Sequence, residues 1–339
     1  MKTLRLLLTS GSLETDPALL EAAAILRSGG LVAFPTETVY GLGANALDAQ
    51  AVEKIFEAKQ RPHWDPVIVH VCDIAQARKL VLEFPEPVER LAAAFWPGPL
   101  TMLLGRAAVI PDICTAGREK VGLRMPFHPL AMALIAAAGV PVAAPSANRF
   151  GHTSPTTAAH VLADLDGRID AILDAGSSAI GVESTVLDPT TDPPIIYRPG
   201  GITLEQIRQL LPNVVVAKRK ISDEVPPESL ESPGLGIRHY APRARVVLVE
   251  SENELTAVVE REAQHSHVGV LLPSEWTSPQ TAWAIVPWGN WNEPESLARD
   301  LYLQMRALDE RSVDVIVCPL PPPIGIGMAI RDRLRKAAK

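Results

Sequence analysis

The sequence predicts a two-domain α/β protein, and two observations lead to this prediction. Short apolar, β-branched segments alternate with segments of helical periodicity throughout residues 1–211, a pattern typical of interleaved strands and helices. The same alternation resumes at residue 243, after a proline-rich stretch without sustained periodicity. We therefore predict a first domain over residues 1–211, a linker over 212–242, and a smaller parallel-sheet domain over 243–339.

Boundary residues justify the elements of the first domain in order. Asp16 is a suitable N-cap and Pro17 a suitable first residue for a helix that ends before Gly29. A second helix, residues 49–58, is stopped by Pro62. The predicted strands lie in residues 1–8, 31–34, 67–71, 100–104, 121–125, 140–144, 170–173, 184–188 and 195–197, and the remaining helices in residues 129–138 and 156–165.

The second domain repeats this pattern on a smaller scale. Its predicted strands are residues 246–249, 268–272, 284–286 and 313–317, with helical patterns between them. Four tryptophans gather in its middle, and we interpret them as core or interface residues rather than as a platform for nucleobases. They are Trp276, Trp283, Trp288 and Trp291.

Composition limits the function classes. Of the 339 residues, 47% are hydrophobic and 21% are charged, which is typical of a globular chain. The formal net charge of −7 gives no overall attraction to nucleic acid or to an anionic membrane. The cysteines, Cys72, Cys114 and Cys318, form no C-x-x-C pair, which argues against disulfides and structural zinc and favours a cytoplasmic protein.

We expect no membrane segment and no signal peptide. The apolar run at residues 4–8 is too short for a signal peptide and is interpreted as part of the first strand. The longest apolar segment, residues 130–144, contains Gly139 and Pro141 and is shorter than the roughly 20 residues that a membrane span needs.

Several loops at predicted strand ends are candidate ligand sites. Lys59 and Arg61 lie on a proline-stiffened turn before the strand 67–71, although they could simply complement the negative end of the preceding helix. Residues 35–43 are interpreted as a polar loop whose glycines would let backbone approach a ligand, with turn geometry as the alternative. The small-residue turn 145–148 follows a strand, where ligands commonly bind in α/β folds.

No familiar phosphate-binding motif is present, since the chain has neither a P-loop nor a G-x-G-x-x-G fingerprint after a strand. Arg124 stands within an apolar strand, so it needs either a carboxylate partner or an anionic ligand. Together with other cations and hydroxyl groups near strand ends, it suits a phosphate-bearing ligand. This set is Lys59, Arg61, Thr115, Arg124, Ser146, Asn148, Ser184 and Arg198.

Eight segments, in order, make the chain similar to the YrdC/Sua5 family. Two further segments, Ser232–Gly234 and His239–Pro242, look like the linker of the two-domain Sua5 form. The resemblance implies a twisted mixed-sheet domain followed by a smaller, Rossmann-like parallel-sheet domain. The eight segments are 35–43 (PTETVYGLG), 59–62 (KQRP), 66–70 (PVIVH), 97–101 (PGPLT), 122–126 (GLRMP), 145–148 (PSAN), 183–186 (ESTV) and 198–200 (RPG).

The resemblance implies the synthesis of threonylcarbamoyl-AMP from ATP, L-threonine and bicarbonate or CO2, with Mg²⁺ accompanying ATP. The product would serve transferase machinery that modifies adenosine 37 of tRNA, and a direct contact with tRNA is left open. The reaction needs no covalent protein nucleophile, because fixed cations, backbone donors and Mg²⁺ can stabilise the charge of phosphoryl transfer.

The resemblance also implies roles for individual residues. Lys59 and Arg61 would be the catalytic cations, and no side chain is expected to bind a metal directly. Thr38, His70, Arg124 and Ser184 would hold threonine or its carbamate, although His70, in an apolar strand, could be an ordinary core residue. The residues expected around ATP are Arg61, Asp65, Thr115, Ser146, Asn148, Ser154, Arg198 and Tyr240.

Two positions depart from the family pattern. Asp65 stands where a neutral residue is usual, and its carboxylate would repel a triphosphate unless a metal or Lys59 offsets it. Leu235 stands where methionine is usual, which concerns only the packing of the linker. We further expect the linker to act as a lid, with Tyr240 closing over the nucleotide.

Two other functions stay open at this point. One is an RNA-binding module, in which the same cations would form a basic concave patch. The other is a different enzyme that forms a carbamoyl-adenylate, although the acylphosphatase-like and zinc-finger regions of the hydrogenase-maturation enzymes are absent from this sequence.

Overall fold

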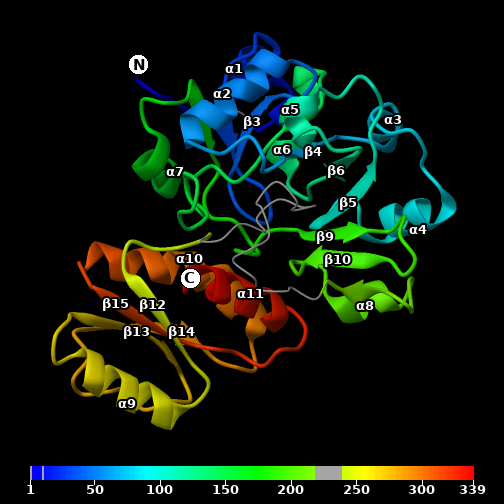
Figure 1. Ribbon diagram of the computed structural model, residues 1–339. Helices are drawn as coiled ribbons and strands as arrows, with labels where there is room; N and C mark the ends of the chain where they lie inside the picture. The colour runs from blue at the N-terminus through cyan, green and yellow to red at the C-terminus, as the bar shows by residue number, and fades with distance from the viewer. Residues whose placement is uncertain (1, 10, 218–238) are drawn as a thin grey trace. The chain divides into compact units, whose positions relative to one another are not determined.

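The chain forms two compact units (Figure 1). The computed structural model describes residues 2–9, 11–217 and 239–339. Of these residues, the first unit contains 2–150, 155–179 and 183–217, and the second contains 151–154, 180–182 and 239–339. Most of the predicted linker, including Ser232–Gly234 and Leu235, lies outside the described residues.

A single mixed sheet organises the described part of the first unit. Its eleven strands are arranged in the order β1-β8-β2-β3-β7-β4-β6-β5-β9-β10-β11, with both parallel and antiparallel neighbours. The mixed sheet implied by the family resemblance is thus confirmed. The strands are β1 (Leu4–Leu7), β2 (Val32–Phe34), β3 (Gly41–Asn45), β4 (Ile68–His70), β5 (Leu100–Gly105), β6 (Lys120–Arg124), β7 (Val142–Ala143), β8 (Ala171–Asp174), β9 (Thr185–Asp188), β10 (Ile195–Arg198) and β11 (Val215–Val216).

Local capping explains where α1 begins, as predicted, and where α6 ends. Asp16 caps α1 by accepting hydrogen bonds from the backbone N–H groups of Ala18 and Leu19, and Gly139 ends α6 in the left-handed conformation. Among the described residues, no helix is both long and apolar enough to cross a membrane. The helices are the 3₁₀ helix η1 (Leu13–Thr15), α1 (Pro17–Arg27), α2 (Ala49–Lys59), α3 (Ile74–Arg78), α4 (Glu86–Phe95), α5 (Asp112–Thr115), α6 (Pro129–Ala138), α7 (Ala158–Leu165) and α8 (Leu204–Arg208).

Hydrophobic clusters cover both faces of this sheet. In β2, Val32 and Phe34 belong to a cluster that includes α1 and α6, whereas Ala33 belongs to a second cluster that includes α2 and α4. Successive residues of a strand point to opposite faces, so β2 is buried on both sides. This explains why the strands of the first unit read as almost continuous apolar runs rather than as alternating patterns.

The interpretation of residues 35–43 as one loop is wrong for its last three residues, 41–43. Gly41 pairs with Phe34 across an antiparallel ladder, and the strand β3 continues from there to Asn45. A Cβ atom at Gly43 would lie 2.8 Å from the Phe34 ring and 2.9 Å from a methyl group of Val142. The close packing of the sheet, rather than an approaching ligand, therefore requires glycine at position 43.

The second unit contains the predicted parallel sheet, which is confirmed. Its strands follow the order β12-β15-β13-β14, and all three pairings are parallel. In Figure 1, α9 lies on one face of the sheet, and α10 and α11 lie on the other. The elements are β12 (Arg245–Val249), α9 (Glu252–Glu262), β13 (Val268–Pro273), β14 (Ala284–Gly289), α10 (Pro294–Glu310), β15 (Val315–Pro319) and α11 (Gly327–Ala337).

Segments from the predicted first domain also belong to this second unit. They are residues 151–154 and 180–182. The backbone N–H of Ala241 donates to the carbonyl of Gly151 at 2.8 Å. Gly181 lies so close to the backbone of α10 that a Cβ atom would be 2.4 Å from the Cα of Arg299. Long-range contacts of this kind override the order of the chain, so the predicted boundary at residue 211 is corrected here.

The start of the predicted linker also belongs to regular structure. Val215 and Val216 form β11, which pairs in parallel with Ile195 and Ile196 of β10. Two residues are too few to show a period in the sequence, and the neighbouring strand supplies the hydrogen bonds that define this short element.

The tryptophans of the second unit do not share one role. Trp288 is buried, and its indole N–H donates to the carbonyl of Leu297 at 3.1 Å, as expected for a core residue. Trp283 is 62% exposed and stacks on His267, with 4.2 Å between the ring centroids. The prediction of core or interface residues is therefore confirmed for Trp288 as a core residue, whereas Trp283 is not in the core and its role at an interface stays a prediction.

We predict that Gly43→Ala lowers the free energy of unfolding by about 1–3 kcal/mol, because the added methyl group must displace Phe34 or Val142 in a packed sheet. Chemical denaturation of the full chain measures this change. Gly11→Ala is the matched control, since no atom of the described residues, apart from its own chain neighbours, lies within 4 Å of the position that its Cβ would take. Equal stability of the two variants would show that the sheet accommodates a side chain at position 43.

Candidate active site

The candidate site begins at the carboxyl ends of two parallel strands. His70 and Arg124 are the last residues of β4 and β6, and they are partners in the register of the ladder. The carboxyl ends of parallel strands meet at the same sheet edge, where α/β proteins commonly bind ligands. Two of the residues predicted to bind threonine are therefore neighbours, although 54 positions separate them in the sequence.

Arg124 is buried and paired, as a charged residue in an apolar strand must be. Its Nη2 lies 2.8 Å from Oε1 of Glu37 and donates to Oγ1 of Thr38 at 2.9 Å. Thr38 Oγ1 is in turn 2.8 Å from Oγ1 of Thr36. Of the two partners expected for Arg124, a carboxylate or an anionic ligand, the structure shows a carboxylate, that of Glu37. Glu37 itself was not selected from the sequence, even though it lies inside the quoted segment 35–43.

His70 is a neutral group in this environment. Burial and the positive charge of Arg124 lower the pKa of its imidazole to about 3, far below the ordinary value of 6.5. The edge of the His70 ring meets the ring of Phe34, with 6.5 Å between the centroids. His70 is therefore neutral near pH 7, so one ring nitrogen can donate a hydrogen bond and the other can accept one, and the ring contributes no positive charge.

Ser184 and Arg198 form a second buried group on β9 and β10. The guanidinium of Arg198 donates to the carbonyl of Ser184 through Nε at 3.1 Å and Nη2 at 3.0 Å, and Nη2 also reaches Ser184 Oγ at 3.1 Å. Ser184 Oγ is 2.8 Å from Oγ1 of Thr101. Gly200 lies against the same backbone, where a Cβ atom would be 2.3 Å from the carbonyl carbon of Ser184. These contacts hold the Arg198 side chain in one orientation.

The cationic turn after α2 forms a third group. Arg61 Nη2 lies 2.9 Å from Oδ2 of Asp65 and donates to the carbonyl of Pro66 at 2.7 Å, while Nε donates to the carbonyl of Asp65 at 3.0 Å. Both side chains are almost fully buried. The charge of Asp65 is thus offset by Arg61, a partner that was not expected alongside Lys59 or a metal.

Lys59 connects the end of α2 to the turn after β7. Its Nζ donates to the carbonyl of Ser146 at 2.5 Å and to the carbonyl of Asn148. Burial and the nearby Arg61 charge lower the pKa of this amine well below its ordinary value. The alternative reading, in which Lys59 only complements its own helix end, is wrong, because the amine contacts the 145–148 turn instead.

The remaining predicted ATP residues lie in two places. Thr115 is buried at the end of α5, where its hydroxyl donates to the carbonyl of Asp112 at 3.3 Å. Ser154 and Tyr240 belong to the second unit. The ring of Tyr240 is buried there, stacked against Tyr302, with the guanidinium of Arg333 5.0 Å from its centroid. In the structure, the side chains of Thr115 and Tyr240 contact other protein groups, and their contact with ATP stays a prediction.

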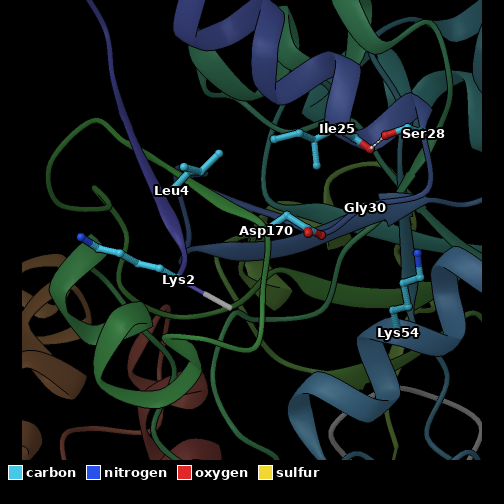
Figure 2. A pocket seen from close by; sticks show the side chains of 7 residues that line it. All are labelled: Lys2, Leu4, Ile25, Ser28, Gly30, Lys54 and Asp170. Carbon is cyan, nitrogen blue, oxygen red and sulfur yellow. Dashed lines mark hydrogen bonds between the residues drawn. The ribbon is translucent and has the colours of Figure 1, made fainter.

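Among the described residues, neither a metal centre nor the pocket shown in Figure 2 is an alternative candidate for the active site. The described residues contain no group of three or more histidine, cysteine or acidic side chains that could hold a metal ion. The pocket has a volume of about 390 Å³ and includes none of the predicted site residues. Two of its charged groups serve the fold, since Asp170 accepts from the backbone of Leu31 and Lys54 donates to the carbonyl of Gly29. Its lining, shown in Figure 2, is Lys2, Leu4, Ile25, Ser28, Gly30, Lys54 and Asp170.

We predict that Asp65→Asn lowers the free energy of unfolding by about 3–5 kcal/mol, because it leaves the Arg61 guanidinium buried without its counter-charge. Urea denaturation measures the loss. The control is Glu89→Gln, which breaks a half-exposed ion pair with Arg78 and should cost about 0–1 kcal/mol. A loss at position 65 no larger than that of the control would contradict a structural role for the Arg61–Asp65 pair.

Comparison with protein families gives two matches in sequence order. The family model Sua5_yciO_yrdC, described as "Telomere recombination", matches residues 24–200. The model Sua5_C, described as "Threonylcarbamoyl-AMP synthase, C-terminal domain", matches residues 202–339.

Individual relatives match over almost the whole chain. The threonylcarbamoyl-AMP synthase of Bacillus subtilis is 46% identical over 326 residues, which cover 95% of this chain and 93% of the relative. The synthase of Pyrococcus abyssi is 42% identical over 325 residues, covering 94% and 93%. The crystal structure of P. abyssi Sua5 complexed with L-threonine matches with a TM-score of 0.91 and 39% identity, covering 100% of this chain and 98% of that one. On this basis, the chain belongs to the Sua5/YciO/YrdC family, in the form that carries the Sua5 C-terminal domain.

Proposed function

We propose that this protein is an L-threonylcarbamoyladenylate synthase, a nucleotidyltransferase that condenses L-threonine, bicarbonate or CO2, and ATP to threonylcarbamoyl-AMP and pyrophosphate. The observation that carries the proposal is the buried Arg124, held beside His70 and Thr38 at the sheet edge. A fixed guanidinium with a neighbouring hydroxyl suits the carboxylate of a small hydroxy amino acid. Relatives that are 42–46% identical bear the name of this enzyme.

The proposed chemistry explains the absence of an activated nucleophile among the candidate residues. The ammonium of threonine loses a proton, and the resulting amine adds to CO2 and releases a second proton to give a carbamate. A carbamate oxygen then attacks the α-phosphorus of ATP while the bond to pyrophosphate breaks. Cys114 and Cys318 are buried and have raised pKa values, so their thiolates do not form near neutral pH. The protein's task is to place two anions together and to stabilise the charge that develops.

Rigid cations suit this task. Lys59, Arg61 and Arg198 each donate to main-chain carbonyls, which fixes their positions before a substrate arrives. Charges that are already oriented stabilise a phosphoryl-transfer transition state without a reorganisation cost. In the proposal, these cations serve ATP together with Thr115, Ser146 and Asn148, and Arg124, Thr38, His70 and Ser184 serve threonine. The role of Ser154 and Tyr240 at ATP stays a prediction.

Magnesium enters the proposal as part of the MgATP substrate. Mg²⁺ is commonly bound by one or two carboxylates and substrate phosphates rather than by an all-protein cage. The described residues offer no cluster of ligands for such a cage, and the Asp65 carboxylate is occupied by Arg61. The activated product would be consumed by a transferase that modifies adenosine 37 of tRNA.

The RNA-binding alternative loses support from the burial of its cations. An electrostatic RNA surface needs exposed lysine and arginine side chains that can reach phosphates. Arg61, Arg124 and Arg198 are each less than 10% exposed and are bound by protein groups. Each is enclosed by its own protein partners, so the three do not form an exposed basic surface.

We predict that the protein releases pyrophosphate and forms threonylcarbamoyl-AMP when it is given MgATP, L-threonine and bicarbonate. Both a pyrophosphate assay and mass spectrometry of the adenylate measure this activity. Omission of either threonine or bicarbonate should abolish the pyrophosphate release. Pyrophosphate release that continues unchanged without threonine or without bicarbonate would contradict the proposed function.

We further predict that removing individual cations affects the use of ATP and of threonine differently. Lys59→Ala and Arg61→Ala should each lower kcat/KM by at least about tenfold to a hundredfold, since a charge-assisted contact to phosphate is worth roughly 1.5–3 kcal/mol. Arg124→Ala should mainly raise the apparent KM for threonine. Steady-state kinetics and calorimetry with ATP test the division, and Arg78→Ala, at a half-exposed ion pair, is the control. Equal losses of ATP affinity in all three variants would contradict it.

A further inference from the structure

Glu37 is a buried carboxylate whose bonding capacity is incompletely used. Its side chain is 6% exposed, and its contact with Arg124 Nη2 at 2.8 Å is an ion pair. Among the described residues, no donor forms a hydrogen bond of normal geometry with either carboxylate oxygen. Buried carboxylates normally accept several hydrogen bonds, so these two oxygens are suited to a further donor.

Glu37 and the groups that face it form a cluster that carries no net charge. Arg124 contributes one positive charge and Glu37 one negative charge, while Thr36 and Thr38 are neutral. His128, at the start of α6, faces Glu37, and burial lowers the pKa of its imidazole despite the carboxylate's opposing effect. His70 has a pKa lowered to about 3. Both imidazoles are therefore neutral near pH 7.

A neutral buried cluster discriminates between ligands by their charge. A ligand that carries only a carboxylate would pair with Arg124 but would leave two carboxylates around one guanidinium, with one uncompensated buried charge. An α-amino acid adds one carboxylate and one ammonium, so the site stays neutral. The three N–H donors of an ammonium also match the carboxylate oxygens that lack hydrogen bonds.

We propose that Glu37 binds the α-ammonium group of the amino-acid substrate and thereby selects amino acids over carboxylates that lack an amine. Arg124 and Thr38 then hold the substrate carboxylate. This inference rests on the proposed function, because it names the group at the same site that recognises the substrate's nitrogen. Glu37 acts here as a specificity-determining residue.

The test compares L-threonine with (R)-3-hydroxybutyrate, which keeps the carboxylate and hydroxyl groups but lacks the amine. Calorimetry on the full chain measures both dissociation constants. We expect Glu37→Gln to weaken threonine binding by at least about tenfold, as for the loss of a charged hydrogen bond, and to leave the affinity for (R)-3-hydroxybutyrate equal or higher. The ratio of the two affinities should therefore fall by at least about tenfold.

Two further variants make the result decisive. Glu53→Gln removes the carboxylate of an exposed ion pair with His63, and it should leave the ratio unchanged. Glu37→Asp keeps the negative charge and should retain most of the preference for threonine, which also covers the case in which Glu37→Gln does not fold.

Two outcomes overturn the inference. An unchanged ratio in Glu37→Gln would do so, including the case in which both ligands are weakened equally, because Glu37 would then only hold Arg124 in place. If Glu37→Gln does not fold, the test rests on Glu37→Asp. Equal affinity of this variant for L-threonine and (R)-3-hydroxybutyrate would then overturn the inference. If the unmodified protein does not bind L-threonine at all, the proposed function fails instead.

Discussion

The pairing of one buried guanidinium organises the polar interior of the first unit. Arg124 lies at the end of an apolar strand, and a charge in that position is tolerated only when partners surround it. Glu37 and Thr38 reach it from the segment between β2 and β3, and His70 lies beside it in the parallel ladder. The arginine therefore fixes where this segment must fold, and it creates a polar site at a sheet edge whose surroundings are hydrophobic.

The other cations follow the same physical rule with different partners. Lys59 and Arg198 donate chiefly to main-chain carbonyls, and Arg61 combines two carbonyls with the Asp65 carboxylate. Carbonyl groups satisfy a cation's donors without cancelling its charge, so the positive potential stays available to an anion. These side chains therefore lose their rotational freedom when the protein folds rather than when a ligand binds. This arrangement suits an enzyme that works by positioning and electrostatics.

Local sequence signals were sufficient wherever a few consecutive residues decide the structure. Asp16 and Pro17 define the start of α1, and Gly139 defines the end of α6, because capping involves only the adjacent turn. The need of Arg124 for an anionic partner, either a carboxylate or a ligand, also followed from one residue in one strand. Its partner did not, because Glu37 is 87 positions away and nothing local distinguishes it from an exposed glutamate. The site was therefore predicted as a set of residues but not as a set of contacts.

The sequence by itself determined the α/β class, the parallel sheet of the second unit and the residue types that an anionic ligand needs. Tertiary structure decided the rest. It placed Gly43 inside a packed ladder, added Val215–Val216 to the sheet, and assigned residues 151–154 and 180–182 to the second unit. The physical reason is the range of each interaction. Periodicity and capping report on burial and hydrogen bonds within one element, whereas steric exclusion, strand pairing and ion pairing join residues that the chain holds far apart.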